Sequence, residues 1–128
     1  MKKIISTSNA PQAVGPYSQA VQLGQFLFCS GQIAIDPTTQ KVLSDLSVPD
    51  QTIQVMKNID AVLKAADCSF ENIVKTTIFL TSMDDFQSVN EVYAQYFKTA
   101  PPARSTVAVA GLPKGVKVEI EVLAVKGS

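Results

Sequence analysis

The stretch VKVEIEVLAV at residues 116–125 alternates apolar and charged side chains over most of its length. The apolar members are Val116, Val118, Ile120 and Val122, and the charged members are Lys117, Glu119 and Glu121. Successive side chains of a strand point to opposite faces of its sheet, so this period of two predicts a strand with one buried face. The other face of that strand displays the carboxylates of Glu119 and Glu121.

Two further strands are predicted upstream of this one. Residues 104–110 form a strand-like run, which the segment GLPKG at residues 111–115 joins to the final strand. Residues 73–81, IVKTTIFLT, consist mainly of β-branched residues and Phe. That composition favours a buried strand.

A hairpin is predicted nearer the N-terminus, after an irregular arm at residues 6–16. Its strands are residues 18–23 and 26–30, and Gly24-Gln25 joins them. A two-residue link with glycine first is typical of a type II′ turn. The segment Asp36-Pro37-Thr38-Thr39 predicts the turn that follows the hairpin.

Two helices are predicted from apolar residues that recur at steps of three and four. The first lies between Pro49 and Ala66 with Ser47 as its capping residue, and its apolar stripe comprises Ile53, Met56, Ile59, Leu63 and Ala66. The second begins near Ser82 or Asp84 and ends before Pro101-Pro102, and its stripe comprises Phe86, Val89, Tyr93, Tyr96 and Phe97.

The order strand, hairpin strands, helix, strand, helix, strand, strand indicates an α+β fold with two helices on one face of a mixed β-sheet. The length fits a single domain, residues 1–128. Charged residues make up 17% of the chain, against about 25% in an average soluble domain. This low content fits either a monomer rich in uncharged polar residues or a homo-oligomer. The second sheet face, which no helix covers, favours the oligomer.

The composition excludes several kinds of chemistry. With no histidine, the chain has no Ser-His or Cys-His nucleophile pair, no histidine-bound zinc and no histidine general base. Cys29 and Cys68 lie far apart in sequence and predict small buried side chains rather than a metal site or a disulfide. The glycines lack the spacing of a phosphate or dinucleotide loop. Eleven basic and eleven acidic residues cancel, which argues against nucleic acid as the main ligand.

The sequence predicts neither a membrane span nor a secretory leader. No apolar run approaches the roughly 20 residues that cross a bilayer. Lys2 and Lys3 are followed by only two isoleucines before the polar residues from Ser6 onward. We therefore expect the protein to be cytoplasmic.

Arg104 and Glu119 are candidates for catalytic chemistry. Arg104 follows a double proline and begins a strand, so its guanidinium has a restricted direction and suits a carboxylate ligand. The alternative for Arg104 is an ordinary surface ion pair. A carboxylate on a rigid strand beside a fixed arginine would serve as acid and base. The alternative for Glu119 and Glu121 is a solvated strand face.

Other polar residues have two interpretations each. Tyr17 either caps the core or reaches a ligand. Ser30-Gly31 ends an apolar strand, and its glycine either lets an anion approach the backbone N–H groups or simply ends the strand. Asn90 fits an exposed helix position, and Asp84-Asp85 fit a first helical turn better than a metal site.

Five blocks of sequence share a pattern with one known family. The most specific is PARSTVAVAGLPKGVKVEIE at residues 102–121. The others are GPYSQA (15–20), CSGQI (29–33), VKTTIFL (74–80) and VNEVYAQYF (89–97). Taken in their order along the chain, the five blocks resemble the RidA (YjgF-type) family of enamine/imine deaminases. The resemblance extends over essentially the whole chain.

The resemblance implies a fold, an assembly and an activity. The expected fold is a chorismate-mutase-like α+β subunit. Three subunits form a homotrimer whose sheets make a central barrel, with clefts between subunits. Members hydrolyse enamines and imines such as 2-aminoacrylate and 2-aminocrotonate, which pyridoxal-phosphate dehydratases release, to 2-keto acids and ammonia. The resemblance implies neither a metal nor an organic cofactor.

The resemblance also implies roles for single residues. Arg104 matches the arginine that binds the substrate carboxylate, with the Gly31 backbone as a second contact. Glu119 matches the carboxylate that positions and activates water. The remaining positions that match cleft-lining residues are Tyr17, Ser30, Asn90 and Thr106. Many members have cysteine in place of Thr106, and the family uses the backbone carbonyl there, so the difference should be tolerated.

Three other functions stay open at this point. The same cleft would suit a non-catalytic protein that binds a 2-keto acid or another small metabolite. Some members are described as translation inhibitors that cleave RNA, although the neutral charge and the lack of histidine give this little physical support. A chaperone-like or regulatory role through the subunit surface is the third.

Overall fold

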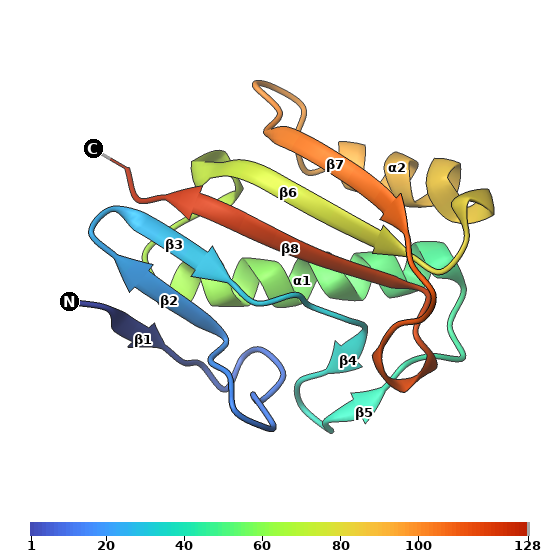
Figure 1. Cartoon of the computed structure of the whole chain (residues 1–128), viewed down its shortest axis with the longest axis horizontal. Helices are drawn as coiled ribbons and strands as arrows, with labels where there is room; N and C mark the ends of the chain where they lie inside the picture. The colour runs from blue at the N-terminus through green and yellow to red at the C-terminus, as the bar shows by residue number, and fades with distance from the viewer. Residues whose placement is uncertain (128) are drawn as a thin grey trace.

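The computed structural model describes residues 1–127 and places six strands in one sheet (Figure 1). The strands are β1 (Lys3–Ile5), β2 (Ala20–Leu23), β3 (Phe26–Cys29), β6 (Ile73–Leu80), β7 (Ala103–Ala108) and β8 (Val118–Val125). Their order across the sheet is β1-β2-β3-β8-β6-β7. Only β6 and β7 run parallel, while every other neighbouring pair is antiparallel. The predicted mixed sheet is therefore confirmed.

The two helices cover one face of the sheet, as predicted (Figure 1). They are α1 (Val48–Ala65) and α2 (Phe86–Ala94), and α2 connects the parallel strands β6 and β7. The predicted cap of α1 is confirmed, because the Asp50 N–H donates to Ser47 Oγ at 3.3 Å. This bond satisfies one of the free N–H groups at the helix start.

The final strand lies in the middle of the sheet, between β3 and β6. Its residues Val118, Ile120 and Val122 are buried in the core that the helices cover. The alternation turns Glu119 and Glu121 to the opposite face, where Glu119 is half-buried and Glu121 is exposed. The sequence prediction for this strand is confirmed, except that it begins two residues later. Val116 instead follows a 3-10 turn at Pro113–Gly115.

The second helix is shorter than predicted. Helix α2 ends at Ala94, so Tyr96 and Phe97 do not extend its apolar stripe, and that part of the prediction is wrong. These two rings pack on Phe70 instead, with centroid distances of 5.2 and 5.7 Å. Aromatic packing outside the helix overrides the helical periodicity here. A 3-10 turn (Met83–Asp85) precedes α2, and Ser82 Oγ accepts from the Asp84 N–H at 3.1 Å.

The face of the sheet opposite the helices, called the open face below, exposes large apolar side chains. Register places Ile4 beside Val21, Val21 beside Phe28 and Phe28 beside Leu123, all on the face that carries Glu119 and Glu121. Ile4 is 52% exposed and Phe28 is 49% exposed. Exposed apolar side chains side by side on one face are typical of a surface that another molecule covers.

The remaining elements are short turns and strands. Gly24 has φ 60° and Gln25 has no positive φ, which agrees with the predicted type II′ hairpin. The turn predicted at residues 36–39 joins two short paired strands, β4 (Ile35–Asp36) and β5 (Lys41–Val42). None of the helices in residues 1–127 is long and apolar enough to cross a membrane. The cytoplasmic location stays a prediction.

Candidate functional site

Arg104 lies on the edge strand β7, and one face of α2 holds its side chain. Arg104 Nη1 donates to Asn90 Oδ1 at 2.6 Å. Arg104 Cζ lies 5.6 Å from the centroid of the Phe86 ring and 5.1 Å from that of Tyr93. Positions 86, 90 and 93 are spaced by four and three, so all three side chains lie on one side of the helix. The sequence analysis assigned the two aromatic residues to the core and missed this role.

Arg104, the only arginine of the chain, has no carboxylate partner in the part of the chain that the structure describes. The ion pairs there join Lys64 to Asp60 and Lys126 to Asp67. Interpreting Arg104 as half of a surface ion pair is therefore wrong for the described residues. Asn90 occupies one donor of the guanidinium, and the remaining donors suit a planar anion such as a carboxylate.

Glu119 folds against the backbone of Gly31. A methyl group built on Gly31 would overlap Glu119 Oε2 and lie 2.8 Å from Glu119 Cδ. The segment is fixed by two backbone hydrogen bonds between Gln32 and Ile120, of 2.9 and 3.1 Å. The sequence left open whether Gly31 lets an anion approach the backbone N–H groups or simply ends the strand; in the structure the Glu119 side chain occupies the space beside this glycine.

The surroundings of Glu119 favour its protonated form. Partial burial raises the pKa of the Glu119 carboxyl above its ordinary value, and the nearby Glu121 carboxylate raises it further. A carboxyl group with a raised pKa is a better proton acceptor near neutral pH than an ordinary surface glutamate. These electrostatics fit the acid-base role expected for Glu119.

Arg104 and Glu119 lie on opposite faces of the sheet within one chain. The register pairs Arg104 with Thr76, a buried residue that contacts α2, so Arg104 faces the helices. Glu119 pairs with Phe79 and faces the open side. One chain therefore does not bring this arginine and this carboxylate together. The candidate site consists of two half-sites, one at Arg104 and one at Glu119 and Gly31.

Tyr17 precedes the first strand of the hairpin and Ser30 follows the second. Ser30 Oγ donates to the Ser18 carbonyl at 2.6 Å, which ties the strand end to the residue after Tyr17. Tyr17 is 53% exposed, so the expectation that its ring caps the core is wrong. Gln19 is the buried residue of this segment. Its side-chain amide donates to the Thr7 and Pro11 carbonyls and so anchors the N-terminal arm.

Thr106 lies on the same side of β7 as Arg104. Its register partner is Ile78, a core residue. Thr106 Oγ1 is buried and lacks a hydrogen-bond partner among the described residues. It borders a narrow cavity with no room for a water molecule, which is lined by Ile78, Leu80, Phe86, Val89, Asn90, Arg104 and Thr106. Because a buried polar group without a partner is costly, we expect this hydroxyl to lower the stability of the fold.

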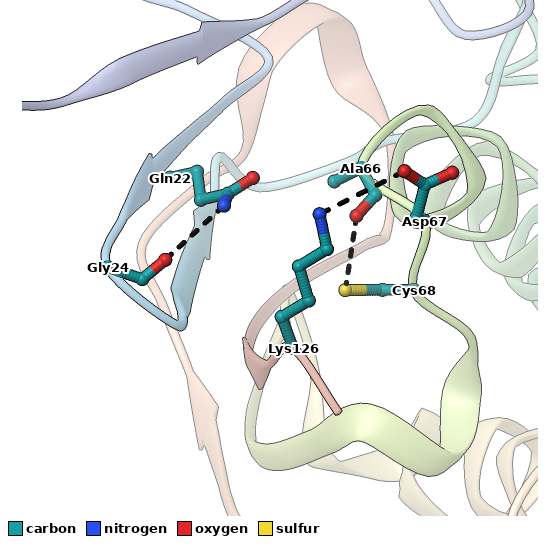
Figure 2. Close-up of polar contacts among 6 residues, drawn as sticks. All are labelled: Gln22, Gly24, Ala66, Asp67, Cys68 and Lys126. Atoms are coloured by element: carbon teal, nitrogen blue, oxygen red, sulfur yellow. Dashed lines mark hydrogen bonds and ion pairs between the residues drawn. The ribbon is translucent and has the colours of Figure 1, made fainter. Parts of the chain in front are cut away.

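Both cysteines are free thiols whose surroundings disfavour the thiolate. Burial raises the pKa of the Cys29 thiol to about 12, with a smaller effect of Cys68. Burial is also the main cause that raises the pKa of Cys68. Figure 2 shows the Cys68 thiol, which donates to the Ala66 carbonyl at 3.6 Å, close to the Lys126–Asp67 pair. Residues 1–127 contain no cluster of Cys, Asp and Glu able to hold a metal ion.

Comparison with known proteins places the chain in a family. Residues 7–126 match the family described as Endoribonuclease L-PSP. The 2-iminobutanoate/2-iminopropanoate deaminase of Mus musculus is 47% identical over 127 residues, covering 99% of this chain and 93% of that protein.

Two solved structures share the fold. A Yersinia pestis protein of the conserved Rid family has a TM-score of 0.95 and 52% identity, covering 98% of this chain and 99% of that one. The YjgF gene product of E. coli has a TM-score of 0.91 and 44% identity, with coverage of 98% and 99%. The chain therefore belongs to the endoribonuclease L-PSP family, together with the YjgF and Rid proteins.

Proposed function

We propose that this protein hydrolyses reactive enamines and imines, such as 2-aminocrotonate and 2-aminoacrylate, to 2-keto acids and ammonia. The observation that carries the proposal is a single arginine, held by α2, without a carboxylate partner in residues 1–127. Such a group is ready to bind the carboxylate of a 2-imino acid. A relative that is 47% identical bears the name 2-iminobutanoate/2-iminopropanoate deaminase, which supports the same chemistry.

The reaction needs orientation and proton transfer more than a strong nucleophile, because an imine carbon is already electrophilic. Arg104 binds the substrate carboxylate, and the Gly31 backbone is a second contact. Glu119 takes a proton from water as the water oxygen bonds to the imine carbon. That proton passes to the imine nitrogen, which gives a carbon carrying both a hydroxyl and an amino group. Glu119 then moves the hydroxyl proton to the amino nitrogen, the carbon–nitrogen bond breaks as the C=O bond forms, and the products are ammonia and a 2-keto acid.

The remaining cleft residues have supporting roles in this proposal. Asn90 orients Arg104 through the hydrogen bond at 2.6 Å. Tyr17 and Ser30 line the cleft near Gly31 and orient the substrate or the water. Thr106 contributes its backbone carbonyl near the water, so the hydroxyl of its side chain is not required.

We further propose that the two half-sites meet between subunits of a homotrimer. The open faces turn inward to form a barrel, which covers the exposed Ile4 and Phe28 side chains. Each cleft then combines Arg104 of one subunit with Glu119 of the partner subunit. Two observations support this arrangement: the unpartnered apolar surface of the open face, and the placement of the two residues on opposite faces of one sheet.

RNA cleavage, which the family description names, is not favoured by this chain. The sequence has no histidine to act as general base, and its basic and acidic residues are equal in number. The binding of a 2-keto acid without turnover is the other alternative, and the assay below separates it from catalysis.

The experiment couples the protein to a threonine or serine dehydratase, which generates 2-aminocrotonate or 2-aminoacrylate, and follows the release of keto acid. The wild type should accelerate the release, whereas Arg104→Ala and Glu119→Gln should abolish the acceleration. Lys114→Ala, at an exposed turn, serves as the control and should behave as wild type. Equal rates with and without the wild-type protein would contradict the proposal and favour a binding protein.

A further inference from the structure

We propose that Tyr93, anchored by Thr76, is a positioning residue that sets the direction of the Arg104 guanidinium. The consequence for turnover rests on the function proposed above, whereas the effect on Arg104 itself does not. Tyr93 belongs to α2, and Thr76 is the residue of β6 paired with Arg104 in the parallel register. Tyr93 of α2 therefore contacts Thr76 of β6 directly beside Arg104 of β7.

Tyr93 and Thr76 form a buried polar pair. Tyr93 is 5% exposed and Thr76 is 1% exposed. Their hydroxyl oxygens lie 2.7 Å apart, within hydrogen-bond distance. Burial raises the pKa of Tyr93, so the phenol stays protonated and available for this bond. A buried polar pair that is fully satisfied fixes the side chains that form it.

The pair holds the Tyr93 ring where a cation–π contact needs it. Arg104 Cζ lies 5.1 Å from the ring centroid, within the roughly 6 Å range of that interaction. The ring of Phe97 lies 4.7 Å from the Tyr93 ring and restricts its movement. Tyr93 is therefore held both at its hydroxyl and at its ring.

Arg104 itself depends on such support. It is exposed on an edge strand and has a long side chain with many rotamers. Asn90 fixes only one nitrogen of its guanidinium. Phe86 is 39% exposed and lies slightly farther away, so its ring is the less constrained of the two. The buried Tyr93 is the contact that restricts the plane of the guanidinium.

The chemistry explains why tyrosine suits this position better than phenylalanine or leucine. Phenylalanine keeps the ring but leaves the Thr76 hydroxyl without its partner, so the ring is less firmly held. Leucine removes both the anchor and the aromatic face. Both changes lower the fraction of molecules in which Arg104 is ready for a carboxylate, and leucine has the larger effect.

The test compares Tyr93→Leu, Tyr93→Phe and Thr76→Val with Val92→Ala as the matched control. Val92 is a buried residue of the same helix that does not line the cavity at Arg104. Because the chain has one arginine, NMR shows a single arginine Nε–H signal, which belongs to Arg104. The chemical shift of that signal depends on how close an aromatic ring lies to the guanidinium and at what angle. Binding of 2-oxobutanoate and the separate values of kcat and KM report the consequence.

We expect Tyr93→Leu to shift the Arg104 signal and to raise both the Kd for 2-oxobutanoate and the KM about five-fold, with kcat changed less. Tyr93→Phe and Thr76→Val should raise them about two-fold. Val92→Ala should lower the melting temperature without either effect. Tyr93→Phe and Thr76→Val keep the ring and remove only its anchor, so an unchanged Arg104 signal in both of them would overturn the proposal even if the wild type is an active deaminase. A shifted signal with an inactive wild type would overturn the proposed function and leave the positioning role intact.

Discussion

Replacing Gly31 with alanine tests whether the placement of Glu119 matters for catalysis. The added methyl group would overlap Glu119 Oε2 and lie 2.8 Å from Cδ, whereas ordinary contacts begin near 3.4 Å. The carboxylate must therefore move away from Gly31. A misplacement of about 1 Å costs on the order of 100-fold in rate, so we expect Gly31→Ala to lower kcat/KM by about that factor.

The same change should leave the fold nearly unaffected. Gly31 does not have a φ in the left-handed region, and the atoms displaced belong to the end of a flexible side chain. Alanine also restricts the unfolded chain, which stabilises the fold by about 0.4–1 kcal/mol and offsets part of the strain. We expect the free energy of unfolding to change by less than about 1 kcal/mol.

The assay measures kcat/KM for 2-aminocrotonate and the unfolding free energy of Gly31→Ala beside Gly111→Ala. Gly111 is the matched control, because a methyl group there meets no atom within 4 Å and its φ is outside the left-handed region. Gly111→Ala should retain wild-type activity. If Gly31→Ala stays folded and its kcat/KM is within about three-fold of wild type, the contact between Glu119 and Gly31 has no part in catalysis.

Three further changes have outcomes that follow from single contacts. Thr106→Val removes the buried hydroxyl without a partner, so it should raise stability by about 1 kcal/mol in denaturant unfolding and leave kcat/KM near wild type; a loss of activity would show that the hydroxyl acts in the reaction. Glu121→Gln removes a cause of the raised pKa of Glu119, so the acidic fall in kcat/KM should move to lower pH; an unmoved profile would contradict the assignment of Glu119 as the base. Folding raises the pKa of Glu119, so the folded state holds this proton more tightly than the unfolded state does. The free energy of unfolding therefore falls as the pH rises above the ordinary pKa of a carboxyl group. Glu119→Gln should therefore unfold at a higher temperature than wild type at neutral pH but not at strongly acidic pH, and the reverse order would refute the pKa direction.

The strand alternation and helix stripes predicted the fold because each signal is local. The period of two in β8 correctly assigned Val118 and Ile120 to the core and Glu119 to the other face. The stripe of α2 failed where packing between distant residues takes over, since Tyr96 and Phe97 turn toward Phe70. Periodicity carries no information on such contacts.

The arrangement of the site depends on pairing between strands, which the sequence pattern does not reveal. Alternation predicts on which side of its own strand each of Arg104 and Glu119 lies. Only the pairing of β6 with both β7 and β8 shows that the two side chains face opposite sides of the sheet. Similarly, the reason for glycine at position 31 is a contact with a side chain on a distant strand. Asn90 shares a helix face with Phe86 and Tyr93, but this is not a specific signal, because Asn58 of α1 is also a buried amide on a core-packing face; only the fold shows that Asn90 binds Arg104.

The most direct test of the shared site mixes two inactive variants. Arg104→Ala and Glu119→Gln subunits are unfolded together in equal amounts and refolded, so that subunits of both kinds assemble at random. If each site takes Arg104 from one subunit and Glu119 from the partner subunit, about one quarter of the sites contain both wild-type residues. The account predicts that the mixture recovers about one quarter of the wild-type deaminase activity, while each variant refolded alone stays inactive. A mixture that stays as inactive as its components would contradict it, because sites built within one chain always lack one of the two residues.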